Sequence, residues 1–204
     1  MIEVNNKPTL GYVIDFWKKY TNDFVFVVGY KKEKVINYVQ KLPINAEFVE
    51  QKQLNGIAAA LLYVEDLVQE HFIVALGDCL YIGHFDIPEN VEQSVGVYKT
   101  ENEDEIKLNY SIEIGEDKYI ARVVEKPKVI INNLCGMGMY LFNRRVFNYI
   151  KKTPPSSLRN EVEITDVIEN MIESGEKISP AFFNGQYLNL THPEDIQKAE
   201  KLLQ

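Results

Sequence analysis

The stretch Phe24-Val-Phe-Val-Val-Gly-Tyr-Lys-Lys-Glu-Lys-Val-Ile-Asn-Tyr-Val-Gln-Lys-Leu42 decides the fold class of this chain. Its first part, Phe24–Gly29, is a short apolar run rich in β-branched and aromatic residues, which is typical of a strand buried on both faces. Its second part, Lys31–Leu42, carries apolar side chains at helical spacing, namely Val35, Ile36, Val39 and Leu42. A buried strand followed by an amphipathic helix predicts an α/β fold.

Two more runs of the same kind follow, Phe72–Leu76 and Ser94–Tyr98. The segment Gly56–Leu67 is apolar nearly all round at its start, as expected of a helix packed deep against a sheet. From this alternation we expect a Rossmann-like, mixed but mainly parallel sheet flanked by helices. In such a sheet, ligands bind outside the carboxyl ends of the parallel strands.

The second half of the chain predicts an antiparallel extension of the sheet. Leu108–Ile114 and Tyr119–Val124 flank a Gly-Glu-Asp-Lys turn and indicate a hairpin, and Cys135–Phe142 is a further strand. Helices are expected at Glu163–Glu173 and Pro193–Leu203. Because no repeat or linker interrupts the pattern, we expect residues 1–204 to form one domain.

The composition excludes several classes of protein. The net charge of -8 disfavours broad binding to nucleic acid, whose phosphates carry the same sign. Two cysteines are too few for a disulfide framework, and neither a signal pattern nor a membrane-length apolar stretch occurs. We therefore expect a cytoplasmic protein with no nucleic-acid or membrane partner. A Rossmann-type dehydrogenase is disfavoured because the sequence has no Gly-x-Gly-x-x-Gly motif.

Three short segments carry side chains suited to nucleotide chemistry. Asp78 ends a strand, where a carboxylate suits Mg²⁺, and the structural alternative is an aspartate that caps the next turn. Lys126, in a Glu-Lys-Pro tripeptide, suits a phosphate, and the alternative is an exposed ion pair. The segment Gln51–Ala60 offers amides for a nucleobase edge and a helix N-terminus for a phosphate. Its alternative is a polar loop before a tightly packed helix.

In their order and spacing these segments resemble the sugar-1-phosphate nucleotidylyltransferases, especially the glucose-1-phosphate thymidylyltransferase-like branch. The matching motifs cover nearly the whole chain: Asn6-Lys7-Pro8 with Tyr12-Val13-Ile14, Gln51 with Gly56-Ile57-Ala58, Leu76-Gly77-Asp78, Glu125-Lys126-Pro127, Asn133 with Gly138 and Tyr140, Glu161-Val162-Glu163-Ile164-Thr165-Asp166, Gly185 with Tyr187, and His192-Pro193-Glu194-Asp195. The family joins a sugar 1-phosphate to a nucleoside triphosphate and releases pyrophosphate, so two anions must be positioned in line.

The resemblance implies catalytic and nucleotide-binding roles for four residues. Asp78 would hold Mg²⁺ and contact the nucleotide, and Lys126 would contact the sugar phosphate. These two would be the catalytic residues. Gln51 and Gly56 would meet the base.

The resemblance also implies a sugar site and a ligand class. Sugar hydroxyls would meet Glu125, Gly138 and Glu161, while Tyr140 and Thr165 would be structural supports. The implied partners are a small-molecule nucleotide, a sugar phosphate or a nucleotide sugar.

Three features depart from the family pattern. The family opens with a strand and a glycine-rich loop that cradles the triphosphate, and this sequence has neither before Asn6-Lys7-Pro8. At the second metal position the family has an aspartate and this chain has Asn189, whose amide oxygen coordinates without adding charge. Thr191-His192 stands where the family usually has Gly-Thr. We therefore expect a degenerate or truncated member that binds a nucleotide sugar or sugar phosphate but is catalytically impaired.

Two other interpretations stay open. One is an active nucleotidylyltransferase whose glycine loop is supplied by another polypeptide or lies upstream of a misassigned start. The other is a non-catalytic subunit that regulates an active relative, and a homo-oligomer is also compatible with the family.

The unmatched opening strand of the family pattern also has a structural consequence. The first central strand is expected to be missing between Phe24–Gly29 and Phe72–Leu76. Because unpaired backbone groups in a core are costly, we expect these two strands to close on each other, or another segment or chain to fill the place.

Overall fold

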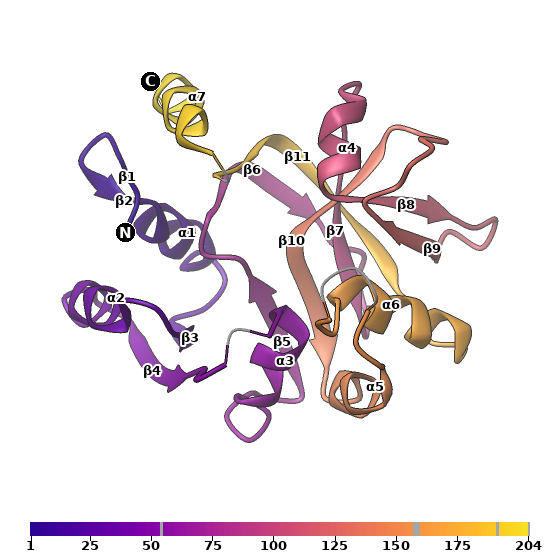
Figure 1. Ribbon diagram of the computed structural model, residues 1–204, viewed down its shortest axis with the longest axis horizontal. Helices are drawn as coiled ribbons and strands as arrows, with labels where there is room; N and C mark the ends of the chain where they lie inside the picture. The colour runs from indigo at the N-terminus through magenta and orange to yellow at the C-terminus, as the bar shows by residue number, and fades with distance from the viewer. Residues whose placement is uncertain (54, 157–159, 191, 204) are drawn as a thin grey trace.

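The computed structural model describes residues 1–53, 55–156, 160–190 and 192–203. Most of its strands belong to one seven-stranded sheet (Figure 1). Its strands are β5 (His71–Ala75), β6 (Cys79–Asp86), β7 (Ser94–Lys99), β8 (Tyr110–Ile114), β9 (Ile120–Glu125), β10 (Leu134–Asn143) and β11 (Ser179–Asn189). They run in the order β6-β11-β7-β10-β8-β9, and β5 pairs with β10.

This main sheet is mixed but mostly antiparallel, so the prediction of a mainly parallel sheet is wrong. β10 is antiparallel to β5, β7 and β8, and only β7 and β11 pair in parallel within the described part of the main sheet. The apolar runs suggested parallel strands because such strands are covered on both faces. Here the double cover comes from two cores on opposite faces of an antiparallel sheet. The predicted hairpin of β8 and β9 is confirmed.

A parallel pair of strands, β3 (Asp23–Val28) and β4 (Asn45–Glu50), forms a separate sheet. The predicted helix α2 (Lys32–Val39) connects them, since parallel neighbours need a crossover. Of the two alternatives stated for β3 and β5, the one in which they close on each other is wrong. β3 pairs with β4 and β5 pairs with β10, and no strand in the described ranges pairs with both.

The other elements surround these sheets. They are the hairpin of β1 (Glu3–Val4) and β2 (Lys7–Pro8) and the helices α1 (Thr9–Trp17), α3 (Ile57–Leu62), α4 (Glu103–Leu108), α5 (Val146–Lys152), α6 (Ile164–Glu173) and α7 (Pro193–Leu202). α6 and α7 match their predicted spans, whereas α3 is shorter than predicted. None of the helices among the described residues has both the length and the apolar character to cross a membrane.

Two hydrophobic cores lie on opposite faces of the main sheet, and β10 divides its side chains between them. Tyr140 and Phe142 point into the first core, to which α5 and α6 contribute. Met137 and Met139 point into the second core, which α1 closes with Trp17. Figure 1 shows α1 on one side of β10, with α5 and α6 on the other. The two cores therefore fix which face each strand residue occupies.

Candidate functional site

The predicted base-binding residues Gln51 and Gly56 lie together, next to the predicted sugar-binding residue Glu161. Gln51 follows β4, and its Nε2 donates to Asn55 Oδ1 at 3.0 Å and to the carbonyl of Gly56 at 3.4 Å. Gly56 precedes α3 with φ 95° and ψ 171°, a region that glycine alone adopts readily. A Cβ at this position would lie 3.1 Å from Glu161 Oε2 and 3.3 Å from the carbonyl oxygen of Val162. The structure thus joins a loop after β4 to the segment before α6.

The predicted metal ligands Asp78 and Asn189 are also neighbours. Asp78 lies in the turn between β5 and β6, and the amide of Leu190 donates to its carbonyl at 2.9 Å. Asn189 ends β11 directly opposite Cys79 in the antiparallel ladder. Within the described part of the chain, its buried Oδ1 has no hydrogen-bond partner. A buried acceptor without a donor is unusual in a folded protein.

The environment of Asp78 raises the pKa of its carboxyl group. Burial among protein atoms is the main cause, and hydrogen bonds from its own backbone and from the Cys79 thiol oppose it. Asp78 is nevertheless accessible to solvent, which places the carboxyl group in a crowded but open position. A cation would favour the charged form and offset the desolvation.

The chemistry of this oxygen pair fits a hard divalent cation. A carboxylate and an amide oxygen are ligands of the type that Mg²⁺ accepts, and Mg²⁺ usually keeps water and phosphate oxygens in its other positions. The described residues contain no cluster of three or more His, Cys, Asp or Glu side chains that could hold a metal. The predicted ligand set thus consists of two side chains, those of Asp78 and Asn189.

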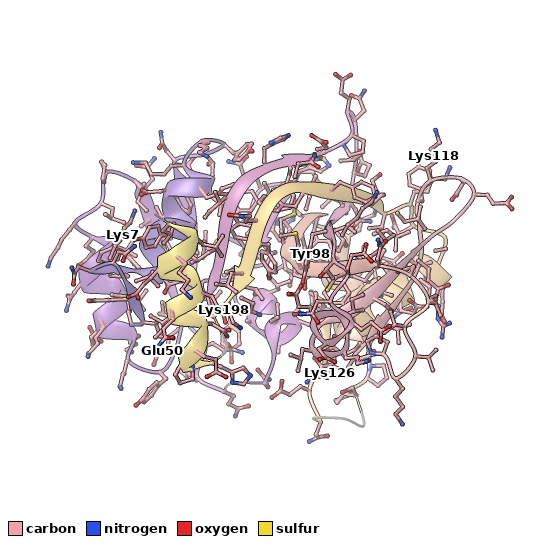
Figure 2. The ribbon with its side chains drawn as sticks, turned by 90° about the horizontal axis from the view of Figure 1, so that it is seen from above. Lys7, Glu50, Tyr98, Lys118, Lys126 and Lys198 are labelled. Carbon is pink, nitrogen blue, oxygen red and sulfur yellow. The ribbon has the colours of Figure 1, made fainter. Side chains whose placement is uncertain are left out.

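The predicted sugar-phosphate residues Glu125 and Lys126 lie at the end of β9. Thr165 of α6 donates to Glu125 Oε2 at 3.3 Å, and the negative charge of Glu125 adds to the burial that raises the pKa of Tyr140. Lys126 has φ 44°, and its amide donates to the carbonyl of Asn109 at 2.8 Å. Its side chain is exposed and labelled in Figure 2. Glu125 is thus held by α6 while Lys126 is open to solvent.

Gly138 contacts residues close to Asp78 in the chain or in space. Its carbonyl accepts from the amide of Leu76 at 3.1 Å and from the hydroxyl of Tyr81 at 2.9 Å. A Cβ on Gly138 would lie 2.7 Å from Leu76 Cδ1, so a side chain is excluded by packing alone. The Tyr187 hydroxyl contacts both the Gly138 amide at 3.4 Å and the Cys79 thiol at 3.1 Å.

Some contacts in this region were not predicted from the sequence. The pairing of Gln51 with Asn55 has a sequence signal, two amides four residues apart. The contact between Cys79 and Tyr187 has none, because the two residues are far apart in the chain. Thr191, where the sequence departs from the family pattern, lies outside the described residues.

Two hollows in the described surface lie away from the predicted site residues. One, of about 250 Å³, is lined by Thr100, Glu101, Glu103, Ile106, Ile130, Asn132 and Asn133. The motif residue Asn133 belongs to it and donates to Glu101 Oε1 at 2.9 Å. The other, of about 190 Å³, lies between α1, β6 and Leu203. Neither brings the predicted catalytic residues together.

Comparison with known proteins shows the family of this chain. A family model described as nucleotidyl transferase matches residues 4–203. The chain is 32% identical to the UTP–glucose-1-phosphate uridylyltransferase AglF of Haloferax volcanii, covering 100% of this chain and 87% of that protein. It is 30% identical to the bifunctional protein GlmU of Methanocaldococcus jannaschii, with 100% of this chain and 48% of that protein covered. The chain therefore spans about half the length of such GlmU relatives.

A solved structure supports the same fold. A UDP-glucose pyrophosphorylase complexed with UDP-glucose superposes with a TM-score of 0.81 at 23% identity, covering 98% of this chain and 88% of that one. At this level of identity the likeness shows the fold.

Proposed function

The chain belongs to the nucleotidyl transferase family, and from this premise we propose that it binds a nucleotide sugar or its sugar-phosphate precursor at the residues described above. One observation carries the proposal: the buried Asn189 oxygen has no partner among the described residues, and Asn189 lies opposite Cys79, the residue that follows Asp78. Such a pair suits a cation that in turn holds phosphate oxygens. The UDP-glucose in the related pyrophosphorylase structure supports a nucleotide sugar as the ligand class.

The base is assigned to the loop after β4. The Gln51 amide uses its N–H groups on Asn55 and Gly56, and its oxygen is the atom that can accept from a base edge. Gly56 lets this loop approach Glu161 closely, since any side chain there would contact the Glu161 carboxylate. Glu161 is then placed to accept hydrogen bonds from hydroxyl groups of the ligand.

The sugar phosphate is assigned to the end of β9 and to β10. Glu125, oriented by Thr165, accepts from sugar hydroxyls, and the backbone of Gly138 lines the same side. Lys126 contributes a mobile point charge to the phosphate.

Asp78 and Asn189 would hold the Mg²⁺ ion with one carboxylate and one amide oxygen. When bound, the ion neutralises negative charge on phosphate oxygens. A single carboxylate gives a weaker site than two, because the amide oxygen contributes no charge.

We also propose that nucleotidyl transfer by these 204 residues is impaired. The neutral Asn189 stands where the resembled family has an aspartate, and the 204 residues contain no glycine-rich phosphate loop. Loss of even one preorganised donor to a developing negative charge costs about 3–4 kcal/mol of transition-state stabilisation. Binding without turnover is therefore the expected behaviour of this chain.

Thermal unfolding with MgCl₂ and a panel of nucleoside triphosphates, sugar 1-phosphates and nucleotide sugars tests the binding. A ligand at 100 times its dissociation constant adds about 2.7 kcal/mol to the free energy of unfolding. Asp78→Asn should abolish this shift, whereas Asp66→Asn, at an exposed position, should keep it. If no compound in the panel stabilises the parent chain, the binding proposal is wrong.

A separate assay of pyrophosphate release tests the impairment. With paired substrates and MgCl₂ we expect no release above the rate given by Asp78→Asn. Release well above that rate would contradict the impairment and leave the assignment of the ligand class intact.

A further inference from the structure

A series of hydrogen bonds connects the backbone of β10 to the carboxyl group of Asp78. The Cys79 thiol donates its hydrogen to Asp78 Oδ1 at 3.6 Å. Because that hydrogen is engaged, the sulfur accepts from the Tyr187 hydroxyl, which lies 3.1 Å away. The Tyr187 oxygen in turn accepts from the amide of Gly138 at 3.4 Å. We call this series, which runs in one direction from Gly138 to Asp78, the Tyr187 network.

The first donor of the network, Gly138, is held in place by its own carbonyl group. It lies in the stretch of β10 where the pairing with β7 shifts its register. Its carbonyl accepts from the Tyr81 hydroxyl at 2.9 Å and from the amide of Leu76 at 3.1 Å. Gly138 therefore offers the Tyr187 hydroxyl an amide donor in a fixed position.

The ring of Tyr187 is held between two other tyrosines. Its centroid lies 5.6 Å from that of Tyr81 and 5.2 Å from that of Tyr98, which Figure 2 labels. All three rings pack in or against the second core. Because packed side chains keep their rotamers, the hydroxyl group stays directed at its two partners.

Tyr187 also lies beside the second predicted metal ligand. In the ladder of β6 and β11, Tyr187 is opposite Tyr81 and Asn189 is opposite Cys79. Opposed residues, and residues two apart on one strand, place their side chains on the same face of a sheet. Tyr187 is therefore the neighbour of Asn189 on β11 and contacts Cys79 diagonally across the ladder, next to Asp78.

We propose that Cys79 and Tyr187 are positioning residues that orient the carboxyl group of Asp78 for a divalent cation. The inference rests on the proposed function, because Asp78 and Asn189 would hold that cation. The thiol engages one oxygen of the Asp78 carboxyl group, which restricts the rotation of that group. Tyr187 fixes the thiol, because it occupies the sulfur as an acceptor. Loss of a group that orients a metal ligand typically weakens metal binding about 10–100-fold.

The test measures binding of Mn²⁺, which takes the same oxygen ligands as Mg²⁺, by the loss of the electron paramagnetic resonance signal of the free ion. Binding that Asp78→Asn abolishes is assigned to the predicted metal ligands. Tyr187→Phe and Cys79→Ala should each weaken this binding about tenfold. The matched control is Tyr98→Phe, which removes the hydroxyl of a neighbouring ring outside the network and should leave Mn²⁺ affinity unchanged.

Two further variants separate positioning from simple packing. Cys79→Ser keeps a donor and an acceptor at this position, so it should recover part of the affinity that Cys79→Ala loses, whereas a purely apolar role would give no recovery. If Tyr187 acts on Asp78 through Cys79, the double variant Cys79→Ala with Tyr187→Phe should bind Mn²⁺ no more weakly than Cys79→Ala alone. Independent effects would instead multiply to about a hundredfold loss.

Hydrogen exchange in the metal-free chain tests the network without any cation. Tyr187→Phe removes the acceptor of the Gly138 amide, so exchange of that amide should accelerate about tenfold. Tyr98→Phe should leave it unchanged.

The possible failures of the two proposals differ. Mn²⁺ affinity equal to the parent in Tyr187→Phe or in Cys79→Ala, or a multiplied loss in the double variant, would overturn the positioning roles and leave the binding proposal intact. Unchanged exchange of the Gly138 amide in Tyr187→Phe would also overturn them. A parent chain that binds no Mn²⁺ through Asp78 would contradict the predicted metal ligands themselves, and the positioning roles with them.

Discussion

We expect Asn189→Asp to destabilise the chain without metal and to strengthen its response to Mg²⁺. The substitution places a negative charge at a buried oxygen that has no partner among the described residues, on the residue opposite Cys79, which follows Asp78. A buried unpaired charge costs about 3–5 kcal/mol, and the unpaired amide oxygen already present costs about 1–3 kcal/mol. The difference between the middle values of these two ranges gives an expected net loss of about 2 kcal/mol in the free energy of unfolding at pH 7.

The pH dependence of this loss has a defined sign. Mutual repulsion and burial raise the folded-state pKa of the carboxyl pair above its unfolded value, so the folded state binds more protons than the unfolded state in that interval. Stability then falls as the pH rises through the folded-state pKa and is regained below it. Mg²⁺ replaces the proton, and at 100 times its dissociation constant it returns about 2.7 kcal/mol.

Urea unfolding between about pH 4 and pH 8, with and without MgCl₂, measures both effects. Asn189→Ala is the matched control, because it removes the unpaired oxygen without adding charge. The alanine variant should equal the parent or exceed it by about 1 kcal/mol, and it should respond less to Mg²⁺. The reasoning is refuted if Asn189→Asp matches the parent at pH 7 without metal, or if its Mg²⁺ response is no larger.

Three further substitutions test the rest of the site. Gly56→Ala should cost about 1–3 kcal/mol in urea unfolding and also weaken nucleotide-sugar binding, because the new methyl group meets Glu161. Gly175→Ala is the control, because Gly175 also has a positive φ but an added Cβ there would have no atom within 4 Å. It should reduce stability without changing ligand binding. Equal binding by both variants would argue against the contact between residue 56 and Glu161. Lys126→Ala should weaken sugar-phosphate binding about tenfold. The control is Lys118→Ala, which changes another exposed lysine at positive φ (Figure 2) and should leave binding unchanged. Titration calorimetry on both variants measures this. Asp78→Asn should be at least as stable as the parent at pH 7 without ligand. Burial raises the folded-state pKa of this carboxyl group, so the parent loses stability as the pH rises through that pKa. A clear loss in the free energy of unfolding, measured in urea, would contradict this reasoning.

The sequence predicts where strands and helices lie much better than how they pair. The apolar run Phe72–Leu76 correctly indicates β5, but its partner β10 lies more than sixty residues away along the chain, and nothing local specifies that pairing or its antiparallel direction. The spacing of apolar residues along a strand indicates which of its faces are buried. It does not indicate direction, because two cores bury an antiparallel strand as fully as helices bury a parallel one. β4 was missed, although its burial alternates along Asn45–Phe48 as expected of a half-buried strand.

The site shows the same division between local motif and distant contact. The motif residues Gln51, Gly56 and Glu161 lie together in the structure, and their ligand roles stay predictions. The steric requirement for glycine at position 56 becomes visible only in the structure. The unpaired oxygen of Asn189 is likewise a property of packing. The sequence indicates an amide in place of a carboxylate, and the structure adds that this amide lies opposite Cys79, one residue from Asp78.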